Sequence, residues 1–392
     1  MWVASSVLWW WGFLAARLLW VCSKDSEGFM NKKMYRAAAI GRTGGGNFGH
    51  NLHLAYRGIE QVDFVAVADP DPAGREKARE QTGAPRAYAD YQEMLEKERP
   101  DLVSVCPRWT DCHVELLLAC LEAGCHVYCE KPMTATLEEG DRVVAAAERA
   151  GRKIAVAHQG VYLPQMHAVR RMLREGKIGE VQAIHAHGKQ DARGGGEDMI
   201  TLGTHLFNMM RFFAGDVAWM SAHVTAGGGD IGPGDVRTAT EPVGPVAGDC
   251  VNSYYAFKSG VAGFFDSRKD QVGGGQRYGM EVVGSQGILS LRGGGAETLM
   301  LYPHPVFLPA EASQGWARVE VESQPLMTGN QLAIRDLIEA IEKDRAPLSS
   351  ARDAVAALEM ILGAYESQIT GGRVPFPMQN RKHPLEQLRR SP

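Results

Sequence analysis

Apolar residues in the first part of the chain come in short runs, separated by stretches with helical periodicity. Runs of roughly four to six apolar residues that end in a turn are typical of strands buried on both faces. Strands are predicted at residues 35–40, 64–68, 102–106, 126–129 and 153–157, and helices at 73–81, 91–97, 113–123 and 137–150. This regular alternation predicts a parallel sheet with covering helices over residues 35–158.

Beyond residue 158 the pattern changes, because successive apolar runs are separated only by glycine-rich turns. Strands are predicted at residues 181–187, 219–225, 251–257, 261–266, 279–283, 288–291 and 298–302, and helices at 167–175, 198–213, 331–343 and 350–369. Short connections favour antiparallel pairing. We therefore expect a second α/β domain with an open, mostly antiparallel sheet at residues 159–378, followed by a polar tail at 379–392.

Composition narrows the class of partner. A chain of 392 residues exceeds one typical domain, and its net charge of −4 lacks the surplus of Lys and Arg that phosphate-backbone binding needs. Nucleic acid is therefore not expected as a partner. The seven cysteines show no two-plus-two zinc spacing, and their odd number gives no complete disulfide framework. Reduced thiols and no metal site are expected.

Residues 1–34 form an apolar leader or a spurious extension. Five tryptophans fall within residues 1–22, a stretch broken only by Arg17. A positive region before the apolar run and a small-x-small cleavage site are both missing. Two interpretations stay open. Translation begins at Met30 or Met34, which predicts a cytoplasmic protein, or residues 1–22 export the protein or anchor it in a membrane.

A glycine-rich turn follows the first predicted strand. Gly44-Gly45-Gly46-Asn47-Phe48-Gly49 satisfies G-x-G-x-x-G and is expected to open a helix, and Asp69 follows 20 residues after Gly49. Such glycines let the backbone approach a pyrophosphate, while the acidic residue binds a ribose 2′-hydroxyl, as in Rossmann domains. A carboxylate repels a 2′-phosphate, so NAD is expected; NADP remains possible if Arg42 or Arg75 compensates.

Glu130-Lys131-Pro132 stands at the end of the apolar run 124–129. Ligands of an open parallel sheet bind beyond the carboxyl ends of its strands, so a lysine emerging there faces a bound cofactor. Pro132 fixes the direction of the backbone. The cofactor-binding residues expected from both motifs are Gly41, Thr43, Gly44, Gly46, Asn47, Phe48, Gly49, Asp69, Pro107, Glu130 and Lys131.

Together these motifs resemble the Gfo/Idh/MocA oxidoreductases. The resemblance covers roughly residues 35–378 and also includes segments 105–113, 122–127, 176–179 and 194–196, Gly203-Thr204-His205 and Val374-Pro375. It implies a Rossmann domain followed by an α/β domain whose open sheet covers the active site and often mediates oligomerisation, so a homo-oligomer is expected. Known members mostly oxidise or reduce sugars, inositols and related polyols with NAD or NADP.

The resemblance also implies a catalytic pair. Lys131 would position and polarise the reacting hydroxyl, and His205, which matches the family's catalytic histidine, would transfer its proton near neutral pH. Members commonly carry an aspartate four residues before this histidine. Thr201 stands there and cannot replace the charge, and Asn208 stands at a second position where aspartate is common.

Asp198 is a further catalytic candidate. It lies two turns before His205 on the predicted helix 198–213, about 10 Å along the axis of a continuous helix, so a direct pair with His205 is not expected. Contact between Asp198 and either the substrate or Lys131 stays open, with Glu197 as the alternative.

Other polar residues near the predicted strand ends carry weaker signals. Arg108 and His113 would flank the cofactor crevice, and His158, Gln159 and Tyr162 follow the last strand of the first domain. Contacts with a sugar or nicotinamide and purely structural roles are both open for these residues.

Three functions follow as hypotheses. The first is an NAD(P)-dependent dehydrogenase that transfers hydride between nicotinamide and a hydroxyl-bearing carbon of a sugar, inositol or related polyol. The second is glycoside cleavage through transient NAD-dependent oxidation. The third is a non-catalytic regulator that binds NAD and a sugar, which Thr201 would suggest; the presence of both Lys131 and His205 favours the enzymes.

Overall fold

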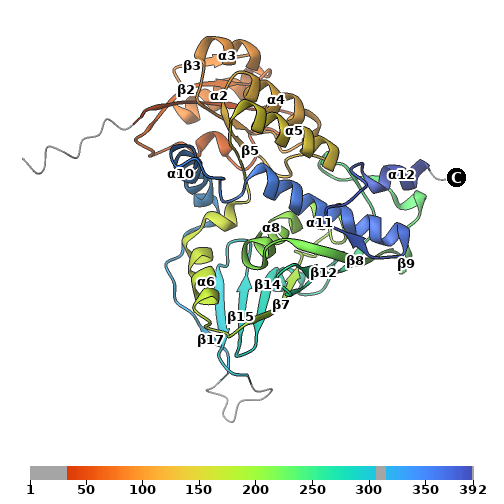
Figure 1. Ribbon diagram of the computed structural model, residues 1–392. Helices are drawn as coiled ribbons and strands as arrows, with labels where there is room; N and C mark the ends of the chain where they lie inside the picture. Colours follow the sequence, from red (N-terminus) through yellow and green to blue (C-terminus); the bar gives the residue numbers. More distant parts are fainter. Residues whose placement is uncertain (1–32, 306–314, 391–392) are drawn as a thin grey trace, which may run out of the picture.

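The computed structural model describes residues 33–305 and 315–390. The apolar segment at residues 1–22 lies outside these residues. Figure 1 shows one sheet in each half of the chain, with the long helix α11 (Ala351–Thr370) running between them. Helix α11 packs against both halves, since it contacts α5 (Leu137–Ala150) of the first domain and α8 (Gly203–Ala214) and β8 (Val217–Ala226) of the second. No helix within the described ranges has the length and apolar character needed to cross a membrane.

The first domain is a six-stranded sheet in which every neighbouring pair is parallel, in the order β3-β2-β1-β4-β5-β6. Its elements are β1 (Tyr35–Ile40), β2 (Val62–Ala68), α2 (Pro72–Thr82), β3 (Arg86–Tyr88), α3 (Tyr91–Glu98), β4 (Leu102–Val105), α4 (His113–Glu122), β5 (His126–Cys129), α5 (Leu137–Ala150) and β6 (Ile154–Val156). The predicted Rossmann domain is confirmed. The strand order reverses between β1 and β4, where such sheets bind ligands.

The second domain carries a ten-stranded sheet with helices against one face. Its main strands are β7 (Val181–His187), β8 (Val217–Ala226), β12 (Cys250–Phe257), β13 (Ala262–Arg268), β14 (Gly279–Gly284), β15 (Ile288–Arg292) and β16 (Thr298–Tyr302). The short strands β9 (Gly229–Asp230), β17 (Ala317–Arg318) and β18 (Val374–Pro375) extend it, and β10 (Arg237–Thr238) pairs with β11 (Pro245–Val246) separately. Every pair except β7 with β13 is antiparallel, which confirms the prediction.

The helices of this half are α6 (Pro164–Arg174), α7 (Gly196–Thr201), α8 (Gly203–Ala214), α9 (Gly274–Arg277), α10 (Gly329–Glu342), α11 and α12 (Pro384–Arg390). Short 3-10 helices are η1 (Leu52–Leu54), η2 (Thr110–Cys112), η3 (Gln159–Tyr162), η4 (Pro233–Asp235) and η6 (Leu326–Thr328). The prediction of one continuous helix at residues 198–213 is wrong in one respect. The helix is broken at Leu202, between the end of α7 and the start of α8.

The helix expected after the glycine turn is also wrong. Only η1 forms there, because Gly49 and Asn51 both adopt positive φ, at 36° and 61°. The N–H of His50, which a regular helix would leave free in its first turn, donates to the Glu130 carboxylate instead. An anion bound at this turn would therefore not be stabilised by the dipole of an α-helix that begins there.

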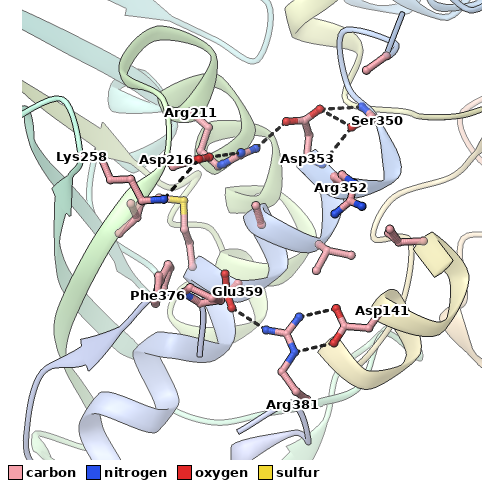
Figure 2. A pocket seen from close by; sticks show the side chains of 17 residues that line it. Asp141, Arg211, Asp216, Lys258, Ser350, Arg352, Asp353, Glu359, Phe376 and Arg381 are labelled. Carbon is pink, nitrogen blue, oxygen red and sulfur yellow. Dashed lines mark hydrogen bonds and ion pairs between the residues drawn. The ribbon is translucent and has the colours of Figure 1, made fainter. Parts of the chain in front are cut away.

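A cavity of about 620 Å³ lies where α5, α8 and α11 meet. Figure 2 shows two arginines there, each bound to two carboxylates. Arg381 joins Asp141 of α5 to Glu359 of α11, at 2.6 and 2.7 Å, and Arg211 joins Asp216 to Asp353. The Arg381 pairs link the two domains, and all four carboxylates are neutralised within the protein.

The segment predicted as a polar tail contains α12, with Leu385 and His383 buried. Burial lowers the pKa of His383 to about 4, below its ordinary value of 6.5. Below about pH 6.5 the unfolded chain binds a proton at His383, whereas the folded protein does not do so until about pH 4. The free energy of unfolding therefore decreases as the pH falls through this range.

We expect His383→Gln to reduce the loss of unfolding free energy between about pH 7 and pH 5, because the variant has no proton to take up there. Urea unfolding at both pH values measures it. His223→Gln, which removes a histidine that is 64% exposed, is the control for the loss of one imidazole. An equal pH dependence in His383→Gln and the unmodified protein would contradict the expectation.

Candidate active site

The glycine turn packs closely on the carboxyl end of β4. Gly46 and Gly49 have φ of 96° and 36°, in the region that favours glycine. A Cβ at Gly46 would collide with the backbone nitrogens of Arg108 and Trp109, and a Cβ at Gly49 with the carbonyl oxygen of Cys106. Glycine is therefore required at both positions for this turn to lie at the switch point of the sheet.

Asp69 ends β2 and holds the glycine turn in place. Its carboxylate accepts hydrogen bonds from Thr43 N and Oγ1, at 3.0 and 2.8 Å, and from Asp71 N at 2.9 Å. A cavity of about 330 Å³ beside it is lined by residues that include Gly41, Asp69 and Tyr91. An acidic group beside a cavity at the ends of β1 and β2 fits the adenosine half of NAD.

The two arginines considered for NADP have partners within the protein. Arg42 donates to Asp111 at 2.6 Å, and Arg75 donates to the carbonyl oxygen of Asp69 at 2.6 Å. Arg42 also lines the cavity beside Asp69, so the argument for NAD over NADP rests on the Asp69 carboxylate, which repels a 2′-phosphate.

Lys131 leaves β5 toward the second domain and is 6% exposed. Its Nζ donates a 2.8 Å hydrogen bond to the carbonyl oxygen of Thr201, the last residue of α7. Burial lowers the pKa of Lys131 below its ordinary 10.5, although the Glu130 and Glu241 carboxylates act in the opposite direction. Thr201 thus provides a backbone carbonyl oxygen, and not a carboxylate, as the acceptor for this ammonium.

Glu130 is fully buried behind Lys131 and pairs with the ring of His50. One of its oxygens also accepts from His50 N, and the other accepts from Lys131 N at 2.7 Å. Burial by itself raises the pKa of Glu130. The charge of His50 and Lys131 and their hydrogen bonds to the carboxylate outweigh this effect, so the pKa of Glu130 lies below its ordinary value. Glu130 therefore fixes the backbone at His50 and at Lys131. His50 was not predicted as a site residue, and its pair with Glu130 places it beside the site.

His205 is buried in the first turn of α8, with no carboxylate partner for its ring among the described residues. Its ring lies edge-on to that of His158, with centroids 5.6 Å apart. Burial lowers the pKa of His205 well below its ordinary 6.5, and the charge of Lys131 and the ring of His158 act in the same direction. The imidazole is therefore neutral near pH 7.

His158 supports this ring and is bonded on both sides. Its Nε2 lies 2.9 Å from Thr204 Oγ1, its Nδ1 lies 3.0 Å from Ser349 Oγ, and Asn208 Nδ2 donates to Nδ1. Burial lowers the pKa of His158 to about 3. His158 and Asn208 therefore form a neutral network that packs beneath His205.

Of the remaining candidates, His113 and Gln159 are also bonded within the protein. The ring nitrogens of His113 lie 2.6 and 3.0 Å from the carbonyl oxygens of Pro107 and Met133, and Gln159 donates to Asn330. Both residues tie strand ends and loops together. Within the described ranges, no group of three or more His, Cys, Asp or Glu side chains could hold a metal ion.

Asp198 does not bond to Lys131 or His205. One carboxylate oxygen accepts from Gln190 N at 3.0 Å and Ser267 Oγ at 2.6 Å, while the other has no hydrogen-bond partner among the described residues. Burial raises its pKa. The neighbouring Glu197 pairs with Arg237 at 2.6 Å. Both carboxylates hold loops rather than the Lys131 ammonium.

The site thus lies between a dinucleotide-binding domain and an α/β domain, and it joins a buried amine to a neutral imidazole, an arrangement typical of a nicotinamide-dependent oxidoreductase. The chain belongs to the Gfo/Idh/MocA family. Residues 39–158 match the family's NAD-binding Rossmann domain, and residues 170–376 match its C-terminal α/β domain. The protein is an NAD(P)-dependent dehydrogenase, as the sequence predicted, and NAD is its expected cofactor.

Similar proteins agree with this assignment. D-apiose dehydrogenase of Paraburkholderia graminis is 27% identical over 361 residues, which cover 87% of this chain and 90% of that protein. Myo-inositol 2-dehydrogenase of Thermotoga maritima is 28% identical over 243 residues, covering 58% of this chain and 67% of that protein. A structure of levoglucosan dehydrogenase with NADH and levoglucosan superposes with a TM-score of 0.73 at 18% identity, covering 88% of this chain and 100% of that chain, and it supports the fold.

Proposed function

We propose that this protein oxidises or reduces a hydroxyl-bearing carbon of a sugar or polyol, using Lys131 and His205. The observation that carries the proposal is the burial of both side chains where the two domains meet, at the carboxyl end of β5. The similar apiose and inositol dehydrogenases support the substrate class.

Each residue has a distinct part in this chemistry. NAD, when bound, supplies the hydride acceptor. Lys131 donates a hydrogen bond to the reacting oxygen and stabilises its developing charge, while the Thr201 carbonyl keeps the ammonium in place. Neutral His205 accepts the hydroxyl proton as hydride leaves the same carbon. The products are a carbonyl compound, NADH and one proton, and reduction runs through the same groups in reverse.

A positioning role suits Asp198 better than a catalytic one. Its bonds to Gln190 and Ser267 order the loop that follows β7, and no bond reaches the catalytic pair. The residues proposed to hold NAD at the switch point are Gly41, Thr43, Gly44, Gly46, Asn47, Phe48, Gly49, Asp69, Pro107, Glu130 and Lys131.

The proposal is tested by following reduced nicotinamide absorbance with a panel of sugars, polyols and glycosides. Glycosides belong in the panel because D-glucoside 3-dehydrogenase of Escherichia coli is 28% identical over 200 residues, covering 47% of this chain and 56% of that protein. Release of a free sugar from a glycoside without net NADH would favour cleavage through transient oxidation. Tight NAD binding without reduction by any compound would favour a regulator, which is supported by the lack of a carboxylate partner for His205 in the part of the chain that the structure describes.

Replacement of Asp69 by Asn is expected to weaken NADH binding about tenfold or more, because it removes a charged acceptor from both the ribose and the glycine turn. Fluorescence titration measures the Kd. Asp63→Asn on the exposed face of β2 is the matched control and should leave Kd unchanged. An unchanged Kd in Asp69→Asn would remove Asp69 from the proposed cofactor site.

The homo-oligomer and the cytoplasmic location stay predictions. The outer sheet face carries Phe264, which is 37% exposed and stacked on His185. Exposed aromatic side chains suit a protein interface. Light scattering on the purified protein gives its mass in solution, and a monomer mass would contradict the oligomer.

A further inference from the structure

The glycine turn contributes to two cavities. Gly41 and Arg42 line the cavity of about 330 Å³ beside Asp69, which fits the adenosine half of NAD. Thr43 and residues 46–49 line a second cavity, of about 690 Å³, whose other walls include one face of α2 and Arg108. We call this second space the turn cavity. It is built on the same turn that is expected to bind NAD.

The turn cavity also borders the segment that carries Lys131. His50 lines the cavity, and its N–H donates to one oxygen of Glu130 at 2.9 Å, while the other oxygen accepts from Lys131 N. Arg108 follows β4, which pairs in parallel with β5, the strand that precedes Lys131. A dinucleotide with its adenosine beside Asp69 and its nicotinamide beside Lys131 therefore has the turn cavity on its path, at the level of its pyrophosphate.

Two walls of the turn cavity rest directly on the glycine turn. A Cβ at Gly74 of α2 would lie 1.9 Å from Thr43 Oγ1, so the helix and the turn are in close contact. In the other wall, Arg108 N donates to the carbonyl oxygen of Gly46 at 3.2 Å. Lys77 follows Gly74 by three residues, about one helical turn, and so lies on the same side of α2. The backbone that carries Lys77 and Arg108 is therefore fixed against the turn.

The turn cavity carries more positive than negative charge. Lys77 is exposed and has no ion pair within residues 33–305 and 315–390. Arg108 is 37% exposed, and its only ion pair in the same part of the chain is one 3.2 Å contact with Glu241. Asp71 is the one carboxylate among the described residues that line the cavity, and its Oδ1 accepts from Gly74 N at 2.6 Å as the N-cap of α2. An ammonium and a guanidinium are thus available to an anion there.

A dinucleotide-binding turn usually has a second source of positive charge, the N-terminus of the α-helix that follows it. Only the three-residue η1 follows the turn here. We propose that Lys77 and Arg108 supply this charge instead, by binding the pyrophosphate of NAD in the turn cavity. A guanidinium forms two parallel hydrogen bonds to phosphate oxygens, and an ammonium adds a point charge. The inference rests on the proposed function, because it assigns two further residues to the same cofactor site.

The test is the Kd of NADH, measured by fluorescence titration without any substrate. Arg108→Gln should raise the Kd about 10- to 100-fold, and Lys77→Gln, at a more exposed position, about three- to tenfold. Lys77→Arg keeps the charge and should bind NADH nearly as well as the unmodified protein. Because charges attract each other here, raising NaCl from about 50 to about 300 mM should weaken binding, and should do so less in the double variant Lys77→Gln/Arg108→Gln.

Arg79→Gln, which removes an exposed guanidinium from the same helix α2, is the control and should leave the Kd unchanged. An unchanged Kd in either Lys77→Gln or Arg108→Gln would overturn the inference. NADPH separates the pyrophosphate from a 2′-phosphate: equal losses are expected for NADH and NADPH, and a loss confined to NADPH would assign the two cations to the 2′-phosphate and also overturn the inference.

The outcome for the proposed function is read separately. Charge-dependent binding of NADH without oxidation of any sugar or polyol would support the inference, and it would then be the proposed function that fails. Oxidation of a sugar by a protein whose Kd for NADH does not depend on Lys77 and Arg108 has the reverse meaning.

Discussion

Lys131→Ala is expected to lower kcat by about 10²- to 10⁴-fold. The ammonium is 6% exposed and held at 2.8 Å by the Thr201 carbonyl, so water cannot readily replace it as a donor to the reacting oxygen. Its charge counts more there than in water, because the surroundings are of low dielectric. Steady-state kinetics on the best substrate of the panel measures the loss.

Two further variants make this test specific. Lys131→Arg keeps a positive charge but places a larger, planar group in a buried site, so it should restore little activity. Lys97→Ala removes an exposed lysine of α3 that pairs with Glu93, and it should leave kcat unchanged. A loss of less than about tenfold in Lys131→Ala would contradict the proposed role.

His205→Ala is expected to lower kcat by about 10²- to 10³-fold, because a positioned proton acceptor is lost. The effect should be smaller than that of Lys131→Ala, since a water molecule admitted by the shortened side chain can accept the proton. His167→Ala, on the half-buried face of α6, is the matched control and should change kcat little. An equally small effect of both histidine variants would exclude His205 as the acid or base.

The pH dependence gives a second test of His205. Burial lowers its pKa well below 6.5, so the neutral, proton-accepting form persists as pH falls to 6.5 and is lost only at lower pH. The acid limb of kcat/KM for oxidation should therefore begin below pH 6.5. An acid limb that does not respond to His205 variants would belong to another group.

The fold could be predicted from the sequence because its strongest signals are local. The parallel strands β1, β4 and β5 are mostly apolar and almost entirely buried, so their burial leaves a clear pattern in the sequence. The glycines at 46 and 49 and the lysine at 131 also belong to motifs whose spacing reflects the turn and strand that carry them.

The rest depends on partners far apart in the sequence. The break between α7 and α8 coincides with the Lys131 bond to the Thr201 carbonyl, across 70 residues, and the His50 pair with Glu130 spans 80. Such contacts override the helical periodicity that predicted one helix at 198–213 and another after the glycine turn. The sequence shows only that Thr201 lacks the charge of an aspartate. The structure shows that Lys131 bonds to the backbone carbonyl oxygen of Thr201, which no side-chain pattern could predict.

Lys131 and His205 are proposed to act together on one hydroxyl group beside the nicotinamide. A crystal structure with NADH and the best substrate of the panel is the direct test. We expect the reacting oxygen within hydrogen-bond reach, about 2.6–3.2 Å, of both Lys131 Nζ and a ring nitrogen of His205, with its carbon facing nicotinamide C4. A substrate bound with that oxygen out of reach of either side chain would rule out this catalytic pair.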